Sequence, residues 1–360
     1  MVVWEFPCES RTLLGSNYKT RYFVAGFFVY NHKLMQLMVK IMNWEDVKRR
    51  SSVLTQIRQF FEIKGVVEVE TPSLSLGTVT DPFLDAFTSQ YSYLSDSNVS
   101  SSTQLYMQTS PEFHMKRLIA SGYKCIYQIC KAFRHEDFGH HHNPEFTILE
   151  WYRLGFDQHS LIAEVNELLS IVLGTGTCEK ITYQDLFLKS VNVDPLSTNF
   201  EELYDVILKH QKGAEWLYES KDCDLLLQFI FSEIIEAGIG NTIPCFVYNF
   251  PIEQASLAKV CPSDSRVAQR FECYFKGLEL ANGFNELTDV DIQQQRFTQD
   301  NKKRKQLSLP ERDIDKNFID ALHLGLPQCA GVALGIDRLI MIALDKSSIE
   351  DVITFSIEKS

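Results

Sequence analysis

The chain has 360 residues, of which 45% are hydrophobic and 23% charged, as is usual for a globular protein with a large core. Its formal net charge of −12 argues against a general nucleic-acid surface, which is usually basic, but is compatible with a local basic groove or a basic protein partner. Nine cysteines occur without a CxxC pair, which argues against a disulfide framework and a cysteine-rich zinc site. The apolar stretch at residues 22–30 is too short to cross a bilayer. We therefore expect a cytoplasmic protein with no membrane segment.

The chain changes character near Met42. Residues 1–41 are rich in aromatic residues and Met and have no clean period, whereas regular patterns begin at Met42. We expect an atypical N-terminal extension at 1–41, not native or added in this lineage, and one domain at 42–360. Within that domain, residues of about 175–240 read as a helical insertion.

The first half of the domain has clear start and stop signals. Asn43 can cap a helix whose apolar positions recur at helical spacing, and Gly65 can end it. Ser110 and Pro111 suit the cap and the first position of a second helix. The serine-rich stretch 95–102 reads as a loop. The expected elements are a helix at 43–65, strands at 66–70 and 105–109, a helix at 110–122, and an antiparallel pair of strands at 126–133 and 146–153 joined by a long loop.

The second half begins with an amphipathic helix and ends with a glycine-led apolar helix. Asp289 can cap a polar helix that runs past Lys303, where residues 302–305 read as a solvated basic face. The expected elements are helices at 159–173, 288–303 and 335–344, an apolar helical core at 225–235, and strand-like alternation at 245–250 and 270–280.

Two arginines stand in contexts that nucleotide chemistry would need. Arg134 lies beside Glu136 at the head of a loop, and Arg338 follows closely spaced glycines and opens an apolar helix. Two fixed guanidiniums far apart in sequence could clamp a polyphosphate from both ends. The familiar phosphate-loop pattern GxxxxGK[ST] is absent, and no GxGxxG follows a strand.

The same segments carry a resemblance to class II aminoacyl-tRNA synthetases of the lysyl type. Residues 65–72 resemble motif 1, a helix and strand at the dimer interface. Residues 133–147, with FRHE and NPEFT, resemble motif 2, and residues 331–338, GVALGIDR, resemble motif 3. The three motifs in order, with proper spacing, are specific where each alone is weak. The resemblance implies an α+β fold, an antiparallel sheet flanked by helices, and a homodimer.

A closer resemblance is to the truncated lysyl-synthetase paralogues that modify elongation factor P with (R)-β-lysine. The strings that carry it are TVTD at 78–81, TSPEFHMKRL at 109–118, ELANGF at 279–284 and GVALG at 331–335. Too few residues precede motif 1 to hold the anticodon-binding OB-fold of a complete lysyl-tRNA synthetase, and they show no five-strand pattern. We therefore expect no such domain, and tRNA is not an expected partner.

The resemblance also implies roles for individual residues, with ATP and Mg²⁺ as cofactors. Arg134 contacts the α-phosphate and the substrate carboxylate, and Arg338 holds the γ-phosphate. Phe146 stacks on the adenine, whose amino group donates to Glu136. Lysyl synthetases usually have glycine where Ala333 stands. The implied nucleotide site is Arg134, His135, Glu136, Asn143, Phe146, Glu279, Leu280, Gly335 and Arg338. The implied amino-acid site is Ser110, Pro111, Glu112, Tyr152, Glu286 and Ala333. The implied Mg²⁺ ligands are Glu279 and Glu286.

Each of these residues has a plainer interpretation. Isolated glutamates are usually surface residues, Phe146 and Tyr152 would usually be core, and the glycines could relieve crowding. Three adjacent histidines at 140–142 suggest a metal site, but neighbours in one loop rarely point at one ion and no carboxylate or cysteine has ligand spacing. His135 stands where the family usually has asparagine.

The leading hypothesis is an ATP-dependent ligase that adenylates lysine or (R)-β-lysine and passes it to the ε-amine of a lysine of elongation factor P. A tRNA-charging enzyme without its own anticodon domain is the second hypothesis. A regulatory paralogue without activity is the third, against which the intact arginines and glutamates count. The sequence leaves the lysine isomer open.

Overall fold

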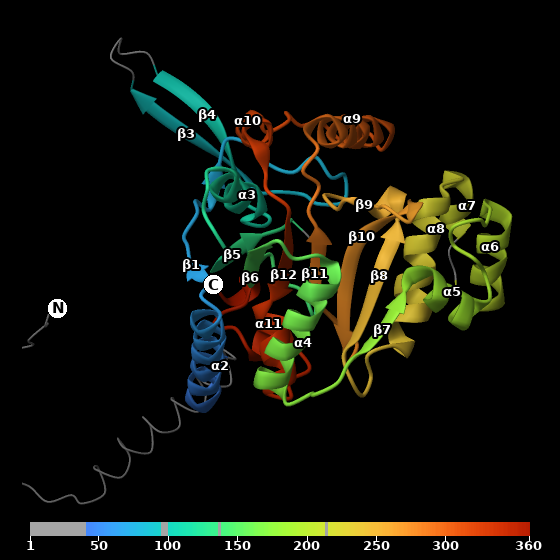
Figure 1. Ribbon diagram of the computed structural model, residues 1–360, viewed down its shortest axis with the longest axis horizontal. Coiled ribbons are helices and arrows are strands. Elements are labelled where there is room, and N and C mark those ends of the chain that lie inside the picture. The colour runs from blue at the N-terminus through green and yellow to red at the C-terminus, as the bar shows by residue number, and fades with distance from the viewer. Residues whose placement is uncertain (1–40, 95–99, 136–137, 213–214) are drawn as a thin grey trace, which may run out of the picture. The chain divides into compact units, whose positions relative to one another are not determined.

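The computed structural model describes residues 41–94, 100–135, 138–212 and 215–360 (Figure 1). Of these, Met42 to Glu358 and Ser360 form one compact unit. The expectations for residues 1–40 and for Glu136 lie outside the described residues.

A large sheet forms the centre of this unit. Its strands run in the order β1-β5-β6-β12-β11-β10-β8-β7, with β9 paired to β10. The interior pairs are antiparallel, whereas the outer pairs β1–β5 and β7–β8 are parallel. The strand bounds are β1 (Val67–Glu68), β5 (Ile126–Phe133), β6 (Glu145–Leu154), β12 (Cys329–Gly335), β11 (Leu278–Asn285), β10 (Asp264–Phe275), β9 (Val260–Cys261), β8 (Cys245–Pro251) and β7 (Glu179–Thr182). This arrangement confirms the expected α+β architecture.

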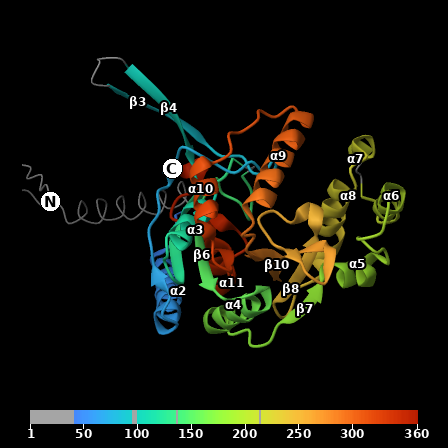
Figure 2. The same ribbon diagram turned by 45° about the horizontal axis from the view of Figure 1, so that its top comes forward.

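Helices cover the two faces unequally. α2 (Trp44–Ile63), α4 (Gln158–Leu173) and α11 (Ile336–Ala343) pack on one face around Trp151 in the largest apolar core (Figure 1). α3 (Glu112–Ala120), α9 (Val290–Gln306) and α10 (Lys316–Gly325) contribute to a second core that contains Tyr152 of the other face (Figure 2). Because strand side chains alternate between faces, neighbouring residues of β6 serve different cores.

The helical segment beside β7 and β8 has an apolar core of its own. Figure 1 places it at that edge of the sheet. It contains α5 (Tyr183–Val191), α6 (Phe200–Lys209), α7 (Glu215–Ser220) and α8 (Cys223–Ile230), followed by a π-helical turn η1 (Phe231–Ile235) and a 3₁₀ turn η2 (Glu236–Gly238).

A second, three-stranded sheet extends away from the large one (Figure 1). Its strands are β2 (Leu74–Ser75), β4 (Ser100–Met107) and β3 (Thr88–Leu94), in that order. Short 3₁₀ turns η3 (Ile252–Gln254), η4 (Ile349–Asp351) and η5 (Ile357–Lys359) complete the described structure. None of the described residues forms a separate OB-fold barrel.

Several predicted elements are confirmed. Asn43 caps α2, where its side chain accepts the Asp46 N–H at 3.0 Å. Gly65 follows the helix with a φ of 64°, which glycine adopts without strain. β5 and β6 pair antiparallel as expected, and Asp289 caps α9.

Two local predictions are wrong. Residues 270–280 are not one strand, because Lys276 and Gly277 turn with positive φ between β10 and β11. Residues 100–102 belong to β4 and not to a loop. Pro111 and not Ser110 is in the cap position of α3, but Ser110 Oγ accepts the N–H of Glu112, the first helical residue, at 3.1 Å. The predicted apolar helix is confirmed as α11, and the strand β12 that contains the glycines before it was not predicted.

Candidate active site

Two adjoining cavities open on the face of the sheet opposite α2, α4 and α11. The first, of about 310 Å³, is here called the arginine cavity; it has Arg134 and Arg338 in its walls. The second, of about 300 Å³, is here called the carboxylate cavity; it has Glu112, Glu150 and Glu286 in its walls. Residues that line both are Arg134, Glu279, Asn282 and Ala333.

Strand alternation brings the lining together. On β6, Phe146 and Ile148 face the arginine cavity, and Glu150 and Tyr152 face the carboxylate cavity. In register across the sheet, Glu150 pairs with Ala333, Ala333 with Asn282, and Asn282 with Glu272. Residues from four strands therefore form one continuous row at the floor of the carboxylate cavity.

A β-bulge on β11 brings Glu279 onto this face. Asn282, Phe284 and Glu286 are two residues apart and point into the carboxylate cavity, so regular alternation would continue at Leu280. Tyr274 pairs with Glu279 and Cys273 with Ala281, which leaves Leu280 as an extra residue. The extra residue shifts the alternation by one and re-aims Glu279 toward the cavities.

Arg134 follows β5 and lies against an aromatic ring. Its guanidinium carbon is 5.1 Å from the centroid of the Phe146 ring, a cation–π distance. Its Nε donates to the Thr109 carbonyl at 3.4 Å. These contacts direct the guanidinium to the boundary between the two cavities.

Arg338 reaches the opposite wall of the arginine cavity from the first turn of α11. Its Nη1 donates to the Glu279 carbonyl at 2.9 Å and lies 3.6 Å from the Glu279 carboxylate. Its Nη2 lies 2.8 Å from His142 Nε2. The adjacent Asp337 is buried, accepts the Thr147 N–H at 2.7 Å and pairs with Arg50 at 2.7 Å, so it anchors this turn to β6 and α2.

Asn143, Leu280 and Gly335 also line the arginine cavity. The side chain of Asn143 is largely used internally. It donates to the Glu145 carbonyl at 2.6 Å and accepts the Ile357 N–H at 3.0 Å, which fixes the loop between β5 and β6.

The carboxylate cavity contains a buried cluster around Lys116 of α3. Lys116 Nζ lies 2.7 Å from Glu112 and 2.5 Å from Glu286, with only 1% of its side chain exposed. Burial alone would lower the pKa of Lys116, but the charges of Glu112 and Glu286 raise it above its usual range. Neither oxygen of Glu286 has a well-directed hydrogen bond from any residue that the structure describes.

Glu150 is also buried in this cluster. It accepts from Ser110 Oγ at 2.6 Å and from the Tyr152 hydroxyl at 2.7 Å. Burial, helped by the charge of Glu112, raises the pKa of Glu150 to about 7. Burial likewise raises the pKa of Glu286 to about 8. Three carboxylates face one lysine, so the cavity suits a ligand that brings further positive charge.

Gly331 is required by this packing. It pairs with Tyr152 in register, and a Cβ at this position would overlap the Tyr152 ring and the Glu286 carboxylate. The glycine therefore does more than relieve crowding in a helix, since it lies in a strand and makes room for two cavity residues.

Glu272 and Arg270 of β10 line the carboxylate cavity. They were not predicted from the sequence, because they lie outside the motifs. Glu272 accepts from Arg270 and from the Tyr274 hydroxyl, and Asn282 Nδ2 donates to it at 3.1 Å. Burial raises the pKa of Glu272, and the Glu279 charge adds to the shift. The alternation of polar residues in β10 was the available signal. Glu150 also lies outside the motifs, whereas Lys116 lies within the string at 109–118 but was given no role.

Some predicted residues are not brought into either cavity. His135 is exposed; its Nδ1 lies 3.1 Å from Asp85, in a separate hollow with Arg312. Pro111 occupies the cap position of α3 and lines neither cavity. Among the described residues, no three His, Cys, Asp or Glu side chains form a metal-binding group, and His142 instead contacts Arg338.

The basic run at 302–305 is not wholly a solvated face. Arg304 is 2% exposed, and its Nε and Nη1 donate to the carbonyls of Pro310 at 2.7 Å and Asp81 at 3.1 Å. The prediction failed because the loop that contacts this side of α9 lies more than two hundred residues earlier in the chain.

The mainly antiparallel sheet, with an arginine after β5 and another at the start of α11, defines a class II synthetase catalytic domain. The family described as "tRNA synthetases class II (D, K and N)" matches residues 28–359, and the chain belongs to this family. The match begins inside the segment 1–41, for which we expected no resemblance. In the described part of the chain, no helix combines the length and the apolar character needed to cross a membrane.

Several curated relatives carry the name elongation factor P–(R)-β-lysine ligase. One from Vibrio atlanticus (strain LGP32) is 50% identical over 317 residues, 88% of this chain and 97% of the relative. One from Pectobacterium carotovorum subsp. carotovorum (strain PC1) is 49% identical over 315 residues, 88% of this chain and 96% of the relative. One from Haemophilus influenzae (strain PittGG) is 48% identical over 329 residues, 90% of this chain and 100% of the relative.

Proposed function

We propose that this protein is an ATP-dependent ligase that adenylates (R)-β-lysine and transfers it to the ε-amine of one lysine of elongation factor P. The observation that carries the proposal is the position of Arg134, which lines both an arginine-bearing cavity and an acidic one. An acyl-adenylate forms when the substrate carboxylate attacks the α-phosphate of ATP. A residue at the boundary between the two cavities can contact both of these groups. The names of the relatives support the choice of acceptor and amino acid.

In the first step, a carboxylate oxygen of the amino acid attacks the α-phosphorus of ATP. The bond to the bridging oxygen breaks, and pyrophosphate leaves. Charge develops on the α-phosphoryl oxygens, so a positioned guanidinium stabilises the transition state more than the ground state. Arg134 supplies this charge, and Arg338 holds the terminal phosphate at the far wall of the arginine cavity.

Carboxylates that face the arginine cavity suit Mg²⁺, which takes oxygen ligands and is usually held by one or two carboxylates together with substrate phosphates. Glu279 lines both cavities, and Glu286 lines the carboxylate cavity. We propose that Glu279 and Glu286 would hold Mg²⁺, as the resemblance to the family implies. When bound, the ion neutralises phosphate charge.

The carboxylate cavity selects the amino acid. Lysine and β-lysine each carry two ammonium groups, and the cavity offers Glu112, Glu150 and Glu286 against one internal lysine. Tyr152 and Ser110 hold Glu150 in place through its two oxygens. The amino acid's carboxylate then faces Arg134.

In the second step, the ε-amine of the acceptor lysine attacks the acyl carbon of the adenylate. An amide bond forms, the bond between the acyl carbon and the adenylate oxygen breaks, AMP leaves, and the amine gives up a proton. No base is needed on the enzyme, because the departing phosphate can accept this proton.

The protein acts as a homodimer in this proposal. Exposed apolar side chains within and on either side of residues 65–72, the segment that resembles motif 1, support an interface, with Ile63 86%, Val67 61% and Leu76 63% exposed. Soluble monomers rarely leave a group of large apolar residues in water without a partner.

The test compares acceptors and amino acids directly. ATP–pyrophosphate exchange would be measured with α-lysine and β-lysine, followed by transfer of the labelled acyl group to elongation factor P or to tRNA. We expect exchange with β-lysine and transfer to elongation factor P alone. Transfer to tRNA would favour a charging enzyme, and no exchange with either isomer would indicate a regulatory paralogue.

Arg134→Ala is the matched variant for this test. Losing one charge-stabilising donor should lower the exchange rate about 10²- to 10³-fold while the melting temperature is kept. Exchange at the wild-type rate in a folded variant would refute the role given to Arg134.

A further inference from the structure

One wall of the carboxylate cavity is a loop without helix or strand. Residues 78–85 lie between β2 and β3 of the three-stranded sheet, and Val79, Asp81 and Leu84 of this loop line the cavity. Thr78 and Thr80 are buried. Among the residues that the structure describes, none from this loop lines the arginine cavity.

The loop is held by side chains from α9. Thr80 Oγ1 donates to Asp300 at 2.6 Å, in a largely buried position. One turn later, Lys303 Nζ lies 5.1 Å from the centroid of the Phe83 ring, at the outer side of the loop. Two side chains of α9 therefore contact the loop, one at the buried Thr80 and one at the exposed Phe83.

The last turns of α9 and the segment after it add contacts to the backbone of the loop. The buried Arg304 donates to the Asp81 carbonyl at 3.1 Å, and Arg312 donates to the Val79 carbonyl at 3.5 Å and pairs with Asp85. Asn301 fixes Arg312 in turn, because its side chain donates to the Arg312 carbonyl at 2.8 Å and accepts the Arg312 N–H at 2.9 Å. The loop is thus contacted by four side chains of the segment 300–312, those of Asp300, Lys303, Arg304 and Arg312.

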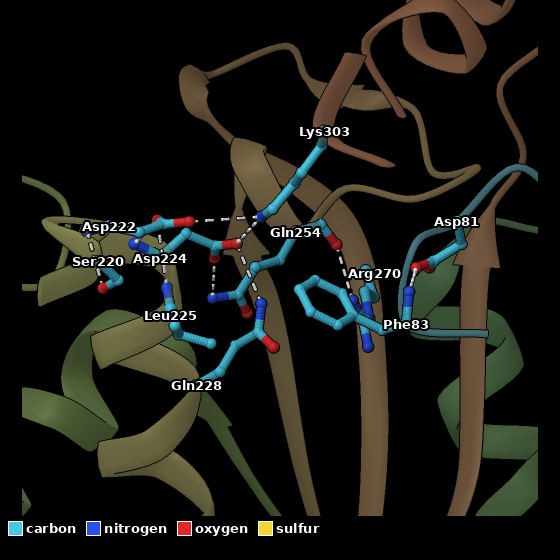
Figure 3. A network of polar contacts seen from close by, with 10 residues as sticks. All are labelled: Asp81, Phe83, Ser220, Asp222, Asp224, Leu225, Gln228, Gln254, Arg270 and Lys303. Atoms are coloured by element: carbon cyan, nitrogen blue, oxygen red, sulfur yellow. Dashed lines mark hydrogen bonds and ion pairs between the residues drawn. The ribbon is translucent and has the colours of Figure 1, made fainter. Parts of the chain in front are cut away.

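Lys303 also forms ion pairs with the helical segment, as Figure 3 shows. Lys303 Nζ lies 3.6 Å from Asp222 and 3.4 Å from Asp224, at the start of α8. Asp224 also accepts from Gln254 Nε2 at 2.8 Å, and the Gln254 carbonyl accepts from Arg270 at 2.7 Å. Arg270 also lines the carboxylate cavity, so this network reaches the cavity through β10 as well.

We propose that residues 300–312 are positioning residues for the amino acid: by holding the loop 78–85 against the carboxylate cavity, they set how tightly the lysine substrate is bound without touching it. This inference rests on the proposed function, since it takes the carboxylate cavity as the amino-acid site.

The geometry separates this role from a general structural one. A change in the loop alters a wall of the carboxylate cavity alone, so the affinity for the amino acid should fall while the affinity for ATP is kept. A variant that merely loosened the fold would weaken both substrates and lower the melting temperature.

The experiment uses two variants with matched controls in the full-length protein. Thr80→Val removes the hydroxyl at constant shape, and Thr80→Ser restores it. Lys303→Glu opposes the Asp222 and Asp224 charges, and Lys302→Glu makes the same charge change at the neighbouring exposed position of α9. ATP–pyrophosphate exchange would give KM for β-lysine and for ATP, and hydrogen–deuterium exchange would report on the peptide that contains residues 78–85.

We expect Thr80→Val and Lys303→Glu to raise the KM for β-lysine about 3- to 10-fold, the effect of losing one or two polar contacts. The KM for ATP should be unchanged, and exchange should be faster in the peptide 78–85 but not in β11. Thr80→Ser and Lys302→Glu should resemble the wild type. Unchanged KM for β-lysine, or an equal rise in both KM values, would overturn the inference. Failure of the wild type to catalyse exchange would overturn the proposed function, and the inference with it.

Discussion

Ala333 lies where the arginine cavity and the carboxylate cavity meet. It pairs with Glu150 on one side and with Asn282 on the other, and its methyl group points into both cavities. In the proposed function, a side chain at this junction borders the carbon atoms next to the substrate carboxylate. An amino group on the α-carbon would be crowded by the methyl, whereas one on the β-carbon would be clear of it.

Ala333→Gly should therefore raise activity toward α-lysine relative to β-lysine. One methyl-sized contact in a pocket changes discrimination by about 1–3 kcal/mol, or roughly 10- to 200-fold. The measurement is the ratio of kcat/KM for the two isomers in wild type and variant. An unchanged ratio would show that Ala333 does not border the reacting end of the amino acid.

The cluster around Lys116 predicts a pH dependence of amino-acid binding. Burial raises the pKa of Glu150 to about 7 and that of Glu286 to about 8, so both are partly protonated near neutral pH. A ligand with two ammonium groups favours the ionised carboxylates and must displace these protons. Affinity for β-lysine should thus rise with pH from about 6 to 8 and level off above, where the carboxylates are already ionised.

Calorimetry in buffers of different ionisation enthalpy would measure the protons released. We expect release at pH 6.5 and almost none at pH 9, and Glu286→Gln should reduce the release. Proton uptake, or an affinity independent of pH in the wild type, would contradict a protonated carboxylate cavity.

The residues found from the sequence are those that short motifs mark: the two arginines, Phe146, Glu279 and Glu286. Glu150, Glu272 and Lys116 could not be found in this way. Their positions in the cavity depend on register across neighbouring strands and on the burial of α3, which short motifs do not specify; the alternation of polar residues in β10 is a local signal for Glu272 alone. The side chain of His135 lies in a separate hollow with Asp85, so its part in the nucleotide site stays a prediction.

At the scale of elements, strong periodicity predicted well and short strands did not. α4, β5 and β6 were expected within one residue of their observed bounds. β12 was hidden by its glycines, which are poor strand formers but are required by Tyr152 and Glu286. The bulge at Leu280 could not be predicted from the sequence either, because it is defined by the pairing of β11 with β10.

The edge strand β1 carries a testable prediction about assembly. Val67 is 61% exposed on this edge, next to the exposed Ile63 at the end of α2. If this surface forms the dimer interface, Val67→Lys places an unpaired charge within it and should weaken the dimer at least tenfold, about 1.4 kcal/mol.

Analytical ultracentrifugation over a range of concentrations would measure this effect. Leu324→Lys is the control, because Leu324 is 77% exposed on α10, far from β1 in the chain. A dimer that survives Val67→Lys but dissociates with Leu324→Lys would move the interface to α10.

At the scale of the whole molecule, the two cavities depend on segments from nearly the full length of the unit. Met42 is 8% exposed and packs in the same core as α2, α4 and α11. The first side chain of the domain is thus part of the core that supports the arginine cavity through Asp337 and Arg50. A chain that begins at this residue keeps every contact described for the two cavities.

A chain that starts at Met42 should therefore fold, dimerise and ligate as well as the full-length protein. The cap at Asn43 and the helical period of α2 begin there, and the relatives align over 312 to 329 residues of a 360-residue chain. The family match begins earlier, at residue 28, so a second shortened chain that starts at that position is the natural comparison. The melting temperature, the sedimentation coefficient and the rate of acyl transfer to elongation factor P would be measured for all three. Equal values would make residues 1–41 dispensable. A loss in the shorter chain alone would assign a role to residues 28–41, and a loss in both would assign one to residues 1–27.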